Sequence, residues 1–156
     1  MWDKLRRHVS TETVQLHTLL DTHRALLGRC AAPGADPTVD EIPALASILH
    51  AFYTGVERIF KRVSLLVDHD PPRGEFWHSD LLERMTQATP TRPAVISAEL
   101  SGVLQEYLDF WHVFRHAYSF QIQWGKMAHL VLGLESLLDS LDGEITGFLA
   151  SLDTET

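Results

Sequence analysis

The stretch TVDEIPALASILHAFYTGVERIFKRVSLLV, residues 38–67, predicts the fold of this chain most directly. Thr38 followed by Glu41 is a capping-box pattern, in which each side chain bonds the backbone amide of the other residue, so a helix begins here. Apolar residues then recur every three or four positions, the spacing of one buried helical face. These residues are Leu45, Ile48, Leu49, Phe52, Val56, Ile59, Phe60, Val63, Leu66 and Val67. The stripe predicts a helix that crosses the whole domain and ends at residues 69–74.

The segments that flank this helix also show helical spacing. Apolar residues within 2–27 predict a first long helix, which ends before the Pro- and Gly-containing residues 32–37. A short helix is expected over residues 79 to about 86. Ser97 then provides the N-cap of a further long helix, whose apolar stripe runs into residues 109–118.

Residues 127–152 have the most regular pattern in the chain, because their apolar positions alternate spacings of four and three. This heptad pattern is typical of a helix that packs nearly antiparallel to its neighbours. The segments together predict an all-α fold, an up-and-down bundle of four long helices plus a short helix, in a single domain of residues 1–156. Some of the glycines on the last helix are expected to mark close approach of another helix: Gly125, Gly133, Gly143 and Gly147.

Composition indicates an ordinary soluble globular protein. The chain has 156 residues, 45% hydrophobic and 22% charged, which suffices for one well-packed domain. Cys30 is the single cysteine and cannot form an internal disulfide. Residues 1–7 lack the apolar run of a signal peptide, and no stretch approaches the roughly 20 apolar residues of a membrane-spanning helix. We therefore expect a cytoplasmic protein with no membrane partner and no cofactor.

The net negative charge of this chain limits how it can bind nucleic acid. The formal net charge is −8, and residues 79–156 hold four Lys or Arg against eleven Asp or Glu. Since non-specific affinity comes from cations that neutralise phosphates, the overall field of the protein does not favour nucleic acid. Any RNA contact must be local. The candidate residues are Lys4, Arg6, Arg7, Arg58, Lys61, Arg62 and Arg115.

Residues 109–118, DFWHVFRHAY, hold two histidines, an arginine, a carboxylate and a tyrosine within ten positions. Cleavage of RNA without a metal needs a base for the 2′-hydroxyl, an acid for the leaving oxygen and a cation for the phosphate charge. Histidine supplies the first two near neutral pH, and arginine supplies the third through its planar fork. His112, Arg115 and His116 are therefore the candidate catalytic residues.

The run RHAY at residues 115–118, with FYTGVERIF at residues 52–60, resembles the HepT group of HEPN ribonuclease toxins. The resemblance covers about residues 40–150. It implies an all-helical homodimer that acts as the toxin of a toxin–antitoxin pair and cleaves RNA without a metal. It also implies a cognate nucleotidyltransferase antitoxin, which attaches AMP to the tyrosine two residues after the motif histidine. That residue is Tyr118 here.

The chain departs from the family motif at one position. In the family an arginine precedes the histidine with four to six residues between them, and those places hold Trp111, Phe110 and Asp109 here. Arg115 is the remaining candidate for the cationic role. Because adjacent residues of a regular helix point about 100° apart, Arg115 and His116 act together only if the helix ends near His116, or if they act across a dimer interface.

Two alternatives to a ribonuclease remain open from the sequence. Asp109, His112 and His116 stand at i, i+3 and i+7 on one helical face, and helical bundles build metal sites from such sets. A catalytically degenerate HEPN-like chain is the other alternative, in which the acidic last helix serves as a binding surface for a partner.

Overall fold

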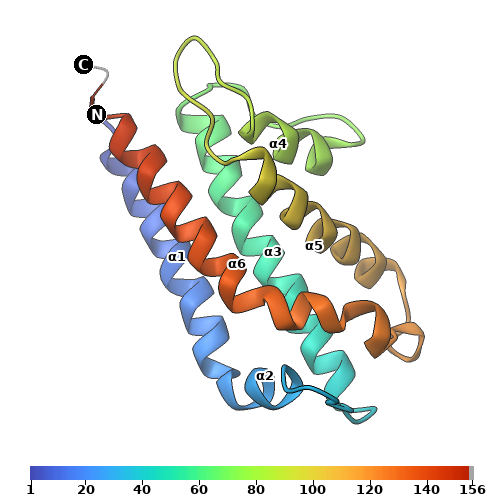
Figure 1. Cartoon of the computed structure of the whole chain (residues 1–156). Helices are drawn as coiled ribbons and strands as arrows, with labels where there is room; N and C mark the ends of the chain where they lie inside the picture. The colour runs from blue at the N-terminus through green and yellow to red at the C-terminus, as the bar shows by residue number, and fades with distance from the viewer. Residues whose placement is uncertain (155–156) are drawn as a thin grey trace.

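The computed structural model describes residues 1–154, which form six α-helices and one 3-10 turn (Figure 1). An isolated backbone bridge between Thr89 and Arg92 is the only β-type pairing in this range. The all-α prediction is therefore confirmed. The elements are α1 (Asp3–Thr22), α2 (Arg24–Cys30), α3 (Glu41–Leu66), α4 (Trp77–Met85), α5 (Ala98–His116), η1 (Ser119–Gln121) and α6 (Trp124–Ser151).

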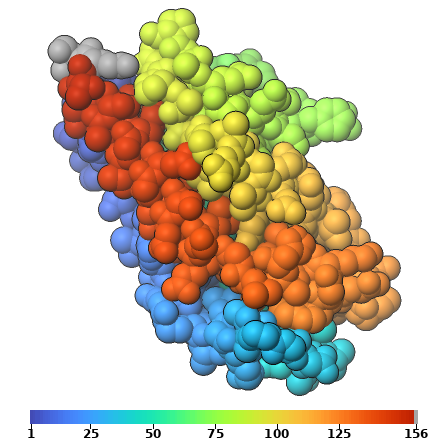
Figure 2. All heavy atoms as spheres, viewed as in Figure 1, coloured from blue at the N-terminus to red at the C-terminus, as the bar shows by residue number. Residues whose placement is uncertain are grey.

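Helix α3 lies in the middle of the bundle. Figure 1 shows α1 and α6 along one side of it and α4 and α5 along the other, and α3 contacts all four of these helices. Figure 2 shows α6 running across the visible face, between α1 and the α4–α5 side. The predicted apolar stripe of α3 is buried at every position but Leu66, which is half-buried. Its burial joins the two sides of the bundle into one hydrophobic core.

Both predicted helix starts are present in the structure. The backbone amide of Thr38 donates to Glu41 Oε1 (3.0 Å), and the amide of Glu41 donates to Thr38 Oγ1 (3.2 Å). At the start of α5, Ser97 Oγ accepts a hydrogen bond from the amide of Leu100 (3.1 Å). These side chains satisfy amides that the first turn of a helix leaves without a partner.

The predicted first helix over residues 2–27 is wrong in one respect. The chain leaves helical geometry at His23 (φ −107°, ψ 19°), and a second helix, α2, continues in another direction. A continuous helix would carry its last turns past the end of the bundle. The bend lets α2 bury Cys30 and contact α6 instead, so tertiary packing overrides the helical spacing.

Close helix approach occurs at two glycines, and only one of them lies on α6. A Cβ on Gly133 would lie 3.3 Å from the hydroxyl of Tyr107, which donates to the Leu130 carbonyl (2.5 Å). On α3, a Cβ on Gly55 would lie 2.6 Å from Leu16 Cδ2 of α1. The other three glycines of α6 have open space at that position: Gly125, Gly143 and Gly147.

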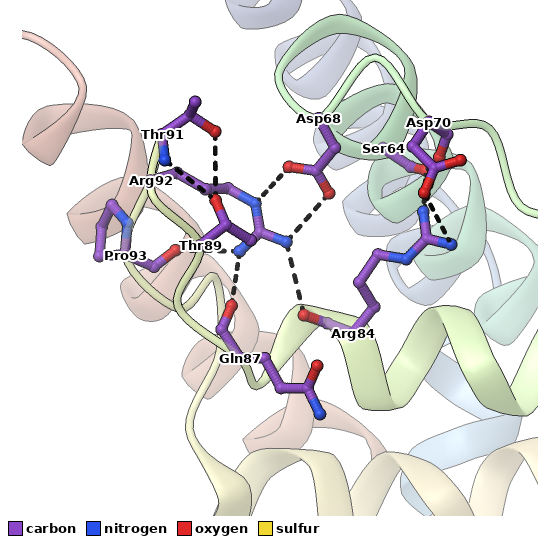
Figure 3. A network of polar contacts seen from close by, with 9 residues as sticks. All are labelled: Ser64, Asp68, Asp70, Arg84, Gln87, Thr89, Thr91, Arg92 and Pro93. Carbon is purple, nitrogen blue, oxygen red and sulfur yellow. Dashed lines mark hydrogen bonds and ion pairs between the residues drawn. The ribbon is translucent and has the colours of Figure 1, made fainter.

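A buried arginine anchors the loop before α5 (Figure 3). The side chain of Arg92 is fully buried, and it donates from Nε and Nη2 to the two carboxylate oxygens of Asp68 (2.6 and 3.0 Å). Its Nη1 donates to the carbonyls of Gln87 (2.9 Å) and Pro93 (3.0 Å), and Nη2 also lies 3.4 Å from the carbonyl of Arg84. Every nitrogen of the guanidinium therefore has a hydrogen-bond acceptor, as a buried charge requires.

A second arginine continues this network to the end of α3 (Figure 3). Arg84 Nη1 donates to Ser64 Oγ (2.8 Å) and to the carbonyl of Asp70 (2.6 Å), and Ser64 Oγ donates to the same carbonyl. These bonds fix α4 against α3. They therefore fix the position of the residues that α4 presents to α5.

Candidate active site

Helix α5 ends within the segment that carries the candidate residues. His116 is its last residue, and Ala117 has an extended backbone (φ −101°, ψ 145°). The amide of Tyr118 then donates to Gln121 Oε1 (2.9 Å), which closes the short turn η1. The helix therefore ends at His116. This is one of the two conditions under which Arg115 and His116 can act in one site.

Trp111 is the centre of the site. Its side chain is buried, and its indole N–H donates to Thr54 Oγ1 of α3 (3.0 Å). The ring of His50 stacks parallel to it (5.5 Å between centroids, 4° between planes), and the ring of His78 lies tilted against it at 4.7 Å. The guanidinium of Arg115 lies over the same indole, 4.6 Å from its centroid.

His112 meets a hydrogen-bonded pair from two other helices. Its ring packs edge-on against His78 of α4 (5.7 Å, 84°). Nδ1 of His78 lies 2.7 Å from Oε2 of Glu57 on α3, and the Glu57 carboxylate is almost fully buried. Three helices therefore bring one carboxylate and two imidazoles together.

The surroundings of two histidine rings at this site lower their pKa values. Burial, followed by the nearby His78, lowers the pKa of His112 below its ordinary value. Burial and then the charge of Arg115 lower the pKa of His50 in the same way, and Nε2 of His50 has no hydrogen-bond partner within residues 1–154. Both rings are therefore mainly neutral near pH 7, the form in which histidine accepts a proton.

The other two predicted site residues lie at the exposed end of α5. His116 is exposed and forms no hydrogen bond, ion pair or ring contact with any residue in the described range. Tyr118 is 72% exposed, and its ring stacks on that of Phe120 (5.6 Å, 6°). The structure thus joins His112 and Arg115 around Trp111 and leaves His116 and Tyr118 open to solvent.

A family model described as HepT-like protein matches residues 44–152. The chain belongs to the HepT-like family. The match confirms the family that residues 115–118 and 52–60 predicted. A comparison with curated proteins and one with solved structures found no match.

Three polar residues of this candidate site were missed by sequence reasoning: His50, Glu57 and His78. Glu57 carried a usable signal, because it follows Tyr53 by four residues and therefore shares a buried helical face. A carboxylate on such a face needs a partner. The partner, His78, lies 21 residues away on another helix, and no local pattern links the two.

The structure groups some of the basic residues that were predicted to contact RNA. Lys4 and Arg7 of α1 and Arg62 of α3 all lie close enough to His8 to lower its pKa, after the larger effect of burial. Nζ of Lys61, the residue before Arg62, lies 4.7 Å from the centre of the Trp77 ring, beside His78. Arg6 instead binds Leu149 and Asp153 of the opposite end of the chain (2.8 and 2.7 Å).

The alternative of a metal site can be compared with the arrangement of residues 1–154. No group of three or more His, Cys, Asp or Glu side chains in this range is arranged to hold a metal ion. Of the three residues in the predicted metal set, Asp109 accepts a hydrogen bond from Gln105 Nε2 (2.9 Å).

None of the helices in the described range has the length and apolar character that a bilayer crossing demands.

Proposed function

We propose that this HepT-like chain is the toxin of a toxin–antitoxin pair and cleaves RNA without a metal ion. Family membership indicates a HEPN toxin-type protein, and HepT-like HEPN proteins are generally related to ribonucleases. The observation that carries the proposal is the group formed by His112, Arg115 and Trp111. It provides a neutral imidazole and a guanidinium side by side, next to the exposed His116.

Each candidate residue has a role that its surroundings support. His112 accepts the proton of the 2′-hydroxyl, since its lowered pKa keeps it neutral near pH 7. The 2′-oxygen then bonds to phosphorus, and the bond from phosphorus to the 5′-oxygen breaks. His116 donates a proton to that leaving oxygen, while Arg115 neutralises the charge that grows on the phosphate.

Trp111 is one of the three positions at which the resemblance expects an arginine, and its ring holds another arginine. The guanidinium of Arg115 stacks on the indole, and the indole is fixed by its bond to Thr54. A cation held on a rigid ring loses little freedom when it binds phosphate. Arg115 is therefore the cation of the proposed site.

The proposed active form is a homodimer in which the two α5 ends face one cleft. The motivation is charge, because the chain has a net charge of −8 and Arg115 is the one guanidinium that the described residues place on Trp111. Two copies of His112, Arg115 and His116 around one symmetry axis provide a stronger phosphate site. Light scattering at micromolar concentration checks this, and a monomeric mass contradicts it.

The proposed partner is a nucleotidyltransferase antitoxin that transfers AMP to Tyr118. The phenol is exposed and lies two residues after His116, as in the family motif. An AMP group at this position adds bulk and a phosphate charge near Arg115, and so it competes with RNA for the same cation.

RNA cleavage by the purified chain tests the proposal. We expect cleavage in the presence of EDTA, and a loss of about 100-fold or more in His116→Ala and in His112→Ala. His129→Ala is the matched control, because His129 is an exposed histidine on α6 that pairs only weakly with Glu106 (3.6 Å). A folded parent chain that binds a nucleotidyltransferase but cleaves no RNA would instead identify the degenerate binding module.

A further inference from the structure

Glu57 is a charged residue in the interior of the bundle. Its carboxylate side chain is 8% exposed, and the partner that compensates its burial is Nδ1 of His78 at 2.7 Å. A buried carboxylate without a partner is strongly destabilising, so this contact is well defined. Because the carboxylate accepts a hydrogen bond from Nδ1, it fixes the orientation of the His78 ring.

The orientation of His78 relative to His112 is fixed as well. Both rings pack against Trp111, at 4.7 Å for His78 and 5.2 Å for His112, and they meet each other edge-on at 5.7 Å. Thr54 holds the indole through its N–H. The two imidazoles therefore have little room to separate.

We propose that Glu57 and His78 are positioning residues for His112: Glu57 holds the His78 ring through Nδ1, and His78 in turn holds the His112 ring edge-on and keeps it in the neutral form of a base. The inference rests on the proposed ribonuclease function, because it makes His112 the base of that reaction. It adds a role for helices α3 and α4, which lie outside the motif of α5.

Charged groups from three helices face His112. Burial has the largest effect on its pKa, and His78 of α4 and Arg115 of α5 lower it further. Asp109 of α5 and Glu57 of α3 act in the opposite sense. His78 is the strongest of these neighbours, so removal of its ring raises the pKa of His112 toward the ordinary value of histidine. A base with a higher pKa is lost to protonation at a higher pH.

Two histidine variants separate this role from simple packing. His78→Gln removes the imidazole that contacts His112. His50→Gln is the matched control, since His50 also packs on Trp111 but forms no ring contact with His112. NMR titration of the His112 ring proton reports protonation without any cleavage. We expect its midpoint to rise in His78→Gln and to stay close to that of the parent in His50→Gln.

The pH profile of RNA cleavage gives the second readout. We expect His78→Gln to lose about three- to tenfold at pH 6 and clearly less at pH 8, because only the low-pH limb depends on protonation of the base. If His78→Gln does not fold, His78→Phe keeps an aromatic edge against His112 and removes the ring nitrogens. The same two measurements then apply.

The NMR titration and the pH profile together distinguish the possible outcomes. An unchanged His112 midpoint in a folded His78 variant overturns the inference, and so does an equal loss of cleavage at both pH values, which indicates a packing role only. A risen midpoint in a chain whose parent form cleaves no RNA supports the coupling of the two rings and contradicts the proposed function.

Discussion

Replacement of Arg92 by methionine is expected to destabilise the bundle more than most single changes. The methionine side chain fills similar space without charge, so Arg92→Met isolates the polar contacts of Figure 3. Asp68, whose side chain is 8% exposed, loses both hydrogen bonds from the guanidinium, and the carbonyls of Gln87 and Pro93 lose their donor. Removal of one partner of a buried ion pair costs about 3–5 kcal/mol.

The melting temperature gives the size of this effect. An unfolding entropy of about 2.1 cal/mol/K per residue, over 156 residues, converts 3–5 kcal/mol into a fall of roughly 9–15 °C. Circular dichroism of the purified chain during heating and urea titration measures it. Since total stability of a domain is about 5–15 kcal/mol, the variant is expected to remain folded at 25 °C.

A double variant identifies the cause. Asp68→Leu combined with Arg92→Met removes both charges of this buried pair, so we expect it to recover at least about 1 kcal/mol of the loss. A loss below about 1 kcal/mol in Arg92→Met refutes the reasoning, because the buried pair would then contribute little. A double variant no more stable than the single one contradicts the assignment to an unpaired Asp68.

Four substitutions at single positions give further predictions. Gly55→Ala is expected to lower stability by about 1 kcal/mol, because overpacking against Leu16 outweighs the gain in helix propensity, whereas Gly143→Ala, with open space around it, is expected to gain up to about 1 kcal/mol in the same thermal assay. Tyr118→Phe is expected to abolish AMP transfer by the cognate nucleotidyltransferase, and peptide mass spectrometry after co-expression tests this; persistent adenylylation would rule Tyr118 out. Trp111→Arg is expected to lower stability by about 3–5 kcal/mol, since the indole is buried, and to raise the cleavage rate per folded molecule if Trp111 occupies the place of the motif arginine. Cleavage normalised to folded protein measures the second effect, and no increase would show that Arg115 already fills the role.

Local signals predicted much of the fold. The reciprocal bonds of Thr38 and Glu41, the cap at Ser97 and the long stripe of α3 depend on residues three or four positions apart, and the structure confirms each of them. The short helix predicted over residues 79–86 lies at Trp77–Met85. Such elements are readable because one helical turn contains the whole signal.

Tertiary contacts decided the rest. The bend at His23 follows from packing of α2 against α6, whereas the apolar spacing of residues 2–27 is compatible with one straight helix. The candidate site shows the same limit, because Glu57 and His78 meet only after α4 docks on α3. Sequence also placed His112 and His116 on one face of α5 without showing that the first contacts His78 and the second faces solvent.

Metal-independent cleavage that uses the 2′-hydroxyl of RNA can be measured with a DNA oligonucleotide that contains one ribonucleotide. The proposed mechanism predicts that the purified chain, in EDTA, cuts this strand only after the ribonucleotide and leaves a 2′,3′-cyclic phosphate, while the all-DNA strand stays intact. The same strand is expected to survive His112→Ala and His116→Ala. Cleavage of the all-DNA strand, or cleavage that stops when EDTA is added, would contradict the account.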